Sequence, residues 1–264
     1  MLQYCAWFCL LIAWTFHCSA SEAPALRIIT VEEPPASFLS AEGKPDGFVV
    51  DLVKALQRQL HDESPLELMP EGRAILTAQQ HANVLLFSFS RTTERENQFH
   101  WILPVLQKRW QIYQSATSRL VLRSQTDLRK LNAIGVVRGD VRETYLVQQG
   151  LTNLVAVTSH QQNLQMLQSG RVEAIAGDSL ELAYQIRQLH NTAAAPQLAL
   201  TLRSSDVYLI MPKNADDKLV KRWQHAVTAL QQTGELEIIA VLWQQRIQQE
   251  MQITVQRDGH MLQF

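Results

Sequence analysis

Short apolar runs alternate with longer amphipathic ones along the chain. Residues 26–31 (LRIITV) have the β-branched composition typical of a strand. Residues 48–60 carry apolar side chains three and four positions apart, which predicts a helix. Further strands are predicted at residues 66–69 and 84–87, with a short helix at residues 73–80 between them. This order predicts a βαβαβ unit with a mainly parallel sheet.

A second series of the same kind follows. Its predicted strands are residues 133–137, 154–157, 174–176 and 198–202, and its predicted helices are residues 142–149, 161–168 and 180–189. Gly150 and Gly170 stand where two of these helices end, a position that favours glycine. Two helices at residues 217–232 and 235–251, separated by Gly234, complete the pattern.

The two series predict an α/β protein with two lobes. Extended segments near residues 111–122 and 201–211 would join the lobes by two crossing connections. We assign residues 21–114 and 205–264 to lobe 1 and residues 115–204 to lobe 2. Ligands of open α/β sheets bind beyond the carboxyl ends of the strands, so facing lobes would place a site in the cleft between them.

The first twenty residues contain no Asp, Glu, Lys or Arg. An apolar stretch at residues 7–14 precedes Cys18-Ser19-Ala20, which predicts a secretion signal cleaved after Ala20. A retained membrane anchor would need about 20 apolar residues, and this stretch is shorter. A lipoprotein would need a small residue before Cys18, where His17 stands. We therefore expect a periplasmic protein.

Composition narrows the chemistry further. All three cysteines lie within the predicted signal, so the mature chain would have neither disulfides nor a thiol nucleophile. The net charge is −1 and the charges are interspersed, which does not suggest nucleic acid or an anionic membrane as a partner. The histidines lack metal-ligand spacing and are predicted to be solvated or capping residues. No nucleotide or nucleophile motif appears, so no metal or cofactor is expected.

Several segments, taken in order, resemble the family 3 periplasmic solute-binding proteins, the polar amino-acid receptors of ABC importers. The segments are residues 34–35 (PP), 43–53 (GKPDGFVVDLV), 73–74 (RA), 88–95 (SFSRTTER), 135–139 (GVVRG) and 170–178 (GRVEAIAGD), followed by Gly234 and Trp243. They cover nearly the whole mature chain.

The resemblance implies a fold, a function and partners. The implied fold is a two-lobed, type II-like periplasmic-binding-protein fold with two hinge-crossing segments. The implied function is capture of a small polar ligand, an amino acid or related compound, in the inter-lobe cleft for ABC-type uptake, without catalysis. The partners would be that ligand and an ABC permease or a sensor membrane protein, and the protein would be a monomer.

The resemblance also implies a binding site. Arg95 occupies the place of the arginine that grips the ligand's α-carboxylate, with Ser88 and Ser90 beside it. The alternative is that Arg95 only pairs with a surface carboxylate such as Glu94 or Glu96. Asp178 matches the carboxylate that accepts hydrogen bonds from the ligand's α-ammonium, although an aspartate at this position also suits a helix N-cap.

Four other positions complete the expected site. Gly139 and Asp140 precede the predicted helix at residue 142, whose free N–H groups would suit an anion, although Asp140 would repel one unless it turned away. Arg73 belongs to a matched segment. Glu33 stands where the family often has an aromatic segment and reads most simply as a loop charge. If it faces the cleft with Asp140 and Asp178, a basic or polyamine-like ligand is favoured.

Two other functions stay open. Some proteins that resemble this family are dehydratases of cyclohexadienyl acids, in which Glu173 or Asp178 here could act as general acid. A periplasmic sensory domain would use the same lobes and the same cleft.

Overall fold

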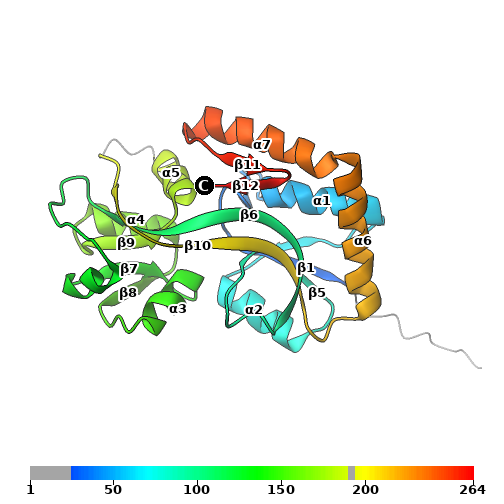
Figure 1. Ribbon diagram of the computed structural model, residues 1–264, viewed down its shortest axis with the longest axis horizontal. Coiled ribbons are helices and arrows are strands. Elements are labelled where there is room, and N and C mark those ends of the chain that lie inside the picture. The colour runs from blue at the N-terminus through cyan, green and yellow to red at the C-terminus, as the bar shows by residue number, and fades with distance from the viewer. Residues whose placement is uncertain (1–24, 190–193) are drawn as a thin grey trace, which may run out of the picture.

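Two long strands run side by side through the molecule and connect its two halves. The computed structural model describes residues 25–189 and 194–264, so the predicted signal lies outside the described residues. β6 (Phe99–Gln114) and β10 (Gln197–Pro212) pair antiparallel over almost their whole length. Figure 1 shows them bridging a left-hand and a right-hand lobe. The predicted two-lobed α/β fold with two crossing segments is confirmed.

The first lobe is built on a parallel sheet of three strands that continues into β10. Its strands are β1 (Arg27–Thr30), β4 (Leu66–Leu68) and β5 (Val84–Ser90), and its helices are α1 (Phe48–Leu60), α2 (Glu71–Gln80), α6 (Asp217–Thr233) and α7 (Glu235–Met251). The order is β4-β1-β5-β10. Apolar faces of α1, α6 and α7 pack on one side of the sheet around buried Trp223. A smaller core under α2 contains Phe89.

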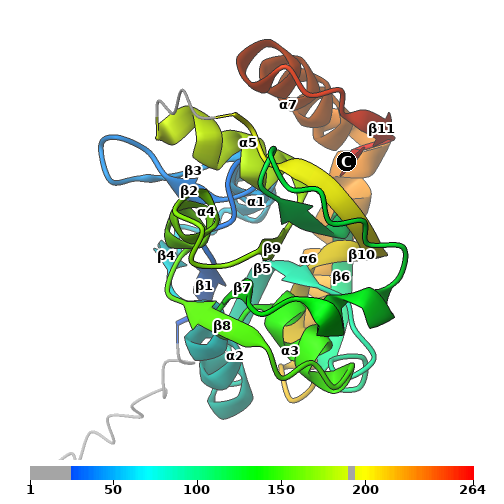
Figure 2. The ribbon, with the colours of Figure 1, turned by 90° about the vertical axis from the view of Figure 1, so that its left-hand side faces the viewer.

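The second lobe repeats the arrangement on the other side of the crossing strands. Its strands are β7 (Ile134–Val137), β8 (Leu154–Val157) and β9 (Ala174–Gly177), and its helices are α3 (Val141–Gln148), α4 (His160–Gln168) and α5 (Ser179–Gln188), with a 3-10 turn at Gln125–Lys130. Here β9 pairs antiparallel with β6 and parallel with β7. Viewed from this lobe, α3 and α5 lie at opposite sides of the sheet (Figure 2).

Four short strands are absent from the sequence-based prediction. β2 (Phe38–Leu39) and β3 (Pro45–Asp46) form a small hairpin, while β11 (Gln256–Asp258) and β12 (Met261–Gln263) form a second one that adds to β6. Segments of two or three residues are too short to show a periodicity. The predicted segment boundaries at residues 114 and 204 fall at the end of β6 and within β10, and the lobe assignment stays a prediction.

Gly47, inside the motif that precedes α1, has a structural reason to be glycine. Its φ is +132°, and a Cβ there would lie 2.4 Å from the carbonyl oxygen of Ala36. The loop after β1 is therefore held tightly against the start of α1. This contact fixes the segment that carries Glu33. Among residues 25–189 and 194–264, no helix is both long enough and apolar enough to cross a bilayer.

Candidate ligand-binding site

Acidic side chains from both lobes meet in the cleft between them. Glu33 follows β1 in the first lobe, whereas Asp140 lies three residues after the end of β7 and Asp178 directly follows β9 in the second. Because the carboxyl ends of these strands face one another, the three carboxylates gather at one place. The side chain of Glu33 is only 12% exposed, so its interpretation as a loop charge is wrong.

Two cations lie among these carboxylates, and neither was predicted from the sequence. Lys108 Nζ, from β6, donates to Glu33 and lies 3.9 Å from Asp178 Oδ2. The guanidinium of Arg142, in the first turn of α3, donates to Asp140 (Nη2–Oδ2, 2.6 Å) and Asp178 (Nη1–Oδ2, 3.1 Å). Both cationic side chains are nearly fully buried.

Arg142 contacts carboxylates of both lobes. Besides Asp140 and Asp178, its guanidinium lies 3.7 Å from Glu181 Oε2 in α5 and 3.9 Å from Glu33 Oε1 across the cleft. Four carboxylates therefore surround one side chain. The Asp140 and Asp178 carboxylates also cap helices, since they accept from the backbone N–H groups of Arg142 and Glu181 respectively. Asp178 therefore caps a helix and also lies in the cleft.

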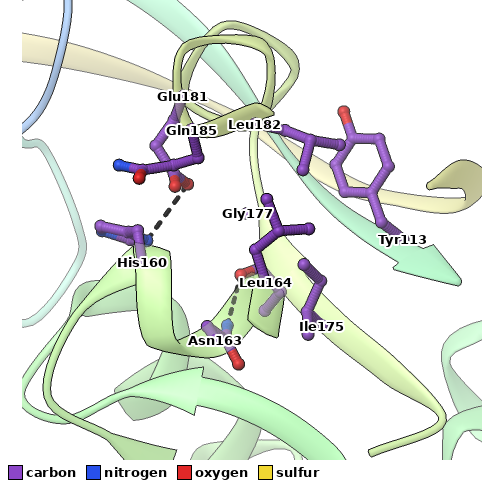
Figure 3. A pocket seen from close by; sticks show the side chains of 10 residues that line it. Tyr113, His160, Asn163, Leu164, Ile175, Gly177, Glu181, Leu182 and Gln185 are labelled. Carbon is purple, nitrogen blue, oxygen red and sulfur yellow. Dashed lines mark hydrogen bonds and ion pairs between the residues drawn. The ribbon is translucent and has the colours of Figure 1, made fainter. Parts of the chain in front are cut away.

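His160, at the start of α4, extends the cluster on its second-lobe side. Its Nδ1 lies 3.1 Å from Glu181 Oε2, and its Nε2 lies 3.8 Å from Asp140 Oδ2. Figure 3 shows His160 and Glu181 joined as an ion pair, and both residues line a small cavity. That cavity measures only about 10 Å³. The prediction that His160 is solvated or capping is wrong, because the side chain is largely buried and lies between two carboxylates.

Arg95 is placed at the first-lobe wall of the cleft, where it has a partner. Its Nη2 donates to Glu71 Oε1 at 2.5 Å, and its Nη1 donates to the carbonyl oxygen of Ser90 at 3.4 Å. Both side chains are largely buried, so the partner is neither Glu94 nor Glu96 and is not a surface carboxylate. Arg91, four residues earlier, pairs instead with Glu96 near the surface.

The other predicted positions differ in what they contribute. Ser88 is buried with a φ of +70°, and its hydroxyl accepts a hydrogen bond from Ser37. The Gly139 N–H donates to Glu143 Oε2 at 2.6 Å, and the Arg142 N–H donates to Asp140. The expectation of free N–H groups for an anion at this helix start is therefore wrong, because the chain's own carboxylates occupy them. Arg73 is exposed on α2.

Burial and pairing act in opposite directions on these groups. Burial disfavours the ionised form of Glu33, but the charges of Lys108 and Arg142 outweigh it and hold the pKa of Glu33 below its ordinary value. Arg142 likewise keeps the pKa of Asp140 low against the effect of burial. For Asp178 burial prevails over Lys108 and Arg142, and its pKa is raised. Burial also raises the pKa of Glu71, although the charge of Arg95 acts to lower it.

The lobes contact each other all along the cleft. On one side Phe38 of β2 packs on Tyr184 of α5, with ring centroids 5.6 Å apart. In the middle, a Cβ added to Gly139 would lie 3.7 Å from the backbone nitrogen of Gly72. On the other side, Glu94 of the first lobe and Gln148 of the second line the same pocket. The structure thus shows the closed arrangement of the lobes.

A pocket of about 260 Å³ opens beside the charged cluster at the hinge. It is lined by Thr92, Thr93, Glu94 and Arg95 of the first lobe, by Val141, Thr144, Tyr145, Gln148 and Gln149 of the second, and by Trp110 and Arg203 of the crossing strands. Arg203 stacks over the Trp110 ring at 5.0 Å. The buried Nε1–H of Trp110 has no hydrogen-bond partner among the described residues. The pocket therefore combines two arginines, Arg95 and Arg203, with the aromatic side chains of Trp110 and Tyr145.

His160 makes the stability of the protein depend on pH. Burial lowers the pKa of His160, but the attraction and hydrogen bond of Glu181 outweigh burial and raise it above its ordinary value, with Asp140 adding to and Arg142 opposing that rise. The stabilisation from this group is therefore complete below the pKa of an unfolded histidine, about 6.5, and is lost as pH rises through the higher folded value.

We expect the wild-type protein to lose stability relative to His160→Gln between about pH 6 and about pH 9, measured by urea unfolding. Exposed His225 supplies the control, and His225→Gln should follow the wild type. Parallel pH profiles for wild type and His160→Gln would contradict the assignment.

Catalytic and metal chemistry receive little support from the geometry. Glu173 lies at the start of β9, at the opposite end of the strand from Asp178, and accepts hydrogen bonds from Asn132. It is therefore away from the cleft and is not the general acid considered above. Within the described part of the chain, no group of three or more His, Cys, Asp or Glu side chains is arranged to hold a metal ion.

Comparison with known proteins identifies the family. Residues 26–246 match the bacterial extracellular solute-binding proteins, family 3, and the chain belongs to this family. The chain is 25% identical over 182 residues to the arginine-binding periplasmic protein of Mannheimia haemolytica, covering 67% of this chain and 73% of that one. It is 24% identical over 213 residues to the L-cystine-binding protein TcyJ of Escherichia coli (strain K12), covering 80% and 78%.

Solved structures show the same fold. A histidine kinase sensor domain described as similar to periplasmic binding proteins superposes with a TM-score of 0.73 at 20% identity, covering 83% of this chain and 95% of that chain. The curated relatives are named as binding proteins. The class defined by fold and sequence is therefore that of ligand-binding proteins of family 3.

Proposed function

We propose that this protein captures a small amino acid-like solute between its lobes in the periplasm and hands it to an ABC permease. The observation that carries the proposal is the hinge pocket of about 260 Å³, in which Arg95 meets residues of both lobes. A pocket of this size suits a ligand of amino-acid dimensions, below the usual range for drug-sized molecules. Arg95 would bind its carboxylate through two parallel hydrogen bonds.

The charges of the cleft favour a ligand that also carries a cation. The carboxylates there are Glu33, Glu71, Asp140, Asp178 and Glu181, and the basic side chains are Arg95, Lys108, Arg142 and His160. The acids thus outnumber these basic side chains. A relative named as an arginine-binding protein is consistent with such a ligand.

A thermal-shift screen tests the proposal. The chain from Ser21 onward would be heated with amino acids, polyamines and small organic acids, because a ligand that binds only the folded state raises the melting temperature. A rise with zwitterionic or cationic amino acids supports the proposal. A rise with dicarboxylates alone would overturn the ligand class, and no shift in a protein that mass spectrometry shows to be empty would overturn solute capture.

A sensory role is the second candidate. It is favoured by the likeness to a histidine kinase sensor domain, which superposes with a TM-score of 0.73. Lobe closure would then be read by a signalling protein instead of a permease. Binding of the isolated membrane partner to the closed protein, with a permease and a sensor kinase compared side by side, distinguishes the two roles.

A further inference from the structure

In the closed structure, the four carboxylates at the centre of the cleft are already paired with a cation of the protein itself. Asp140, Asp178, Glu181 and Glu33 all lie within 4 Å of the Arg142 guanidinium. The guanidinium of Arg142 is a planar cation, like the charged group of a basic solute that would bind at the same position. It is attached to the second lobe, yet it reaches a carboxylate of the first.

Closing a cleft over unpaired carboxylates would be unfavourable, because each buried charge loses its hydration. With Arg142 in place, the cost is offset inside the protein itself. Lys108 also joins the lobes, since it pairs with Glu33 and lies 3.9 Å from Asp178, but it comes from the crossing strand β6. Arg142 belongs to the second lobe itself, and its guanidinium lies within 4 Å of Glu33 and of three second-lobe carboxylates.

We propose that Arg142 is a tethered competitor for the ligand: its guanidinium fills the cationic subsite of the cleft, closes the lobes without solute, and must be displaced before a cationic solute can bind. This inference rests on the proposed function for the ligand class and goes beyond it in assigning Arg142 the control of specificity. The affinity for a cationic solute is then its intrinsic affinity reduced by the competition from Arg142.

Removal of the side chain tests the proposal by chemical rescue. Arg142→Ala leaves a space for one guanidinium ion among four carboxylates. We expect free guanidinium, at millimolar concentration, to raise the melting temperature of Arg142→Ala and to bind it at least about tenfold more tightly than it binds the wild type. Urea, which has nearly the same shape without the charge, should not do so.

The lobe separation provides the second readout. The cysteines all lie in the predicted signal, so spin labels can be placed uniquely at Gln165→Cys in α4 and Lys221→Cys in α6, both exposed positions. Without solute, the wild type should show the short, closed distance and Arg142→Ala a longer one, which guanidinium shortens again. Arg142→Lys should remain closed, and Arg138→Ala, which removes an exposed arginine nearby, should match the wild type.

The proposal is overturned if Arg142→Ala is as closed as the wild type and guanidinium acts no differently from urea. Should Arg142→Ala fail to fold, its recovery by guanidinium and not by urea supports the proposal, while no recovery overturns it. The distance measurement uses no solute from the screen. Its outcome is therefore independent of whether the proposed solute class is right.

Discussion

Replacing Lys108 with methionine is expected to lower the free energy of unfolding by about 3–5 kcal/mol. The Lys108 side chain is 4% exposed and pairs with Glu33, so the substitution removes the hydrogen-bonded cation of a buried carboxylate and leaves Arg142 at 3.9 Å. Asp178, 3.9 Å away, also loses a cationic neighbour. Urea unfolding followed by circular dichroism measures the loss. Lys130→Met, at a side chain that is 76% exposed and paired with Asp127, should cost no more than about 1 kcal/mol.

A double-mutant cycle separates the ion pair from the packing of the lysine stem. In Glu33→Gln/Lys108→Met both charges are gone, so the double variant should recover a large part of the stability that Lys108→Met alone loses. Arg142, 3.9 Å from Glu33, stays available to the remaining acids. A loss for Lys108→Met no larger than for Lys130→Met would contradict the buried pair. So would a double variant no more stable than the single one.

Periodicity predicted the helices and most short strands because these elements bury one regular face. The predicted helix at residues 48–60 coincides with α1, and those at residues 217–232 and 235–251 lie within one residue of α6 and α7. The 16-residue strand β6 was predicted only at its end. Its first half contains Pro104, which lies next to a register shift in the pairing with β10, and such irregularities hide the alternation of a strand.

The site could be predicted only where its residues follow strands. Asp178 comes directly after a buried apolar run and Asp140 three residues after one, and the topology of parallel strands brings such positions together. Arg142 has no comparable signal, because its contacts with Asp178, Glu181 and Glu33 are all distant in sequence. The sequence does carry a signal for Lys108. It is an even number of residues from Trp110 and Ile112, so it lies on the same, buried face of the strand.

Arg95 should matter far more to ligand affinity than Arg91. If a ligand carboxylate binds in the hinge pocket, Arg95→Ala removes its cationic partner and should weaken binding at least about thirtyfold. Arg91 pairs with Glu96 and stacks on Trp101 and Tyr208 away from that pocket, so Arg91→Ala should leave the affinity nearly unchanged. Calorimetric titration with the solute found in the thermal-shift screen measures both. Equal, small effects would contradict the site.

The pairing of Arg95 with Glu71 adds a prediction of opposite sign. Glu71 holds the guanidinium that a ligand carboxylate would need, so the two carboxylates compete for it. Glu71→Gln keeps the shape of the side chain, removes that competing charge, and should tighten binding up to about tenfold. A general loss of structure cannot tighten binding, so weaker binding to Arg95→Ala together with tighter binding to Glu71→Gln would assign the carboxylate subsite to Arg95. Unchanged affinity in Glu71→Gln would instead mean that the ligand carboxylate binds elsewhere in the cleft.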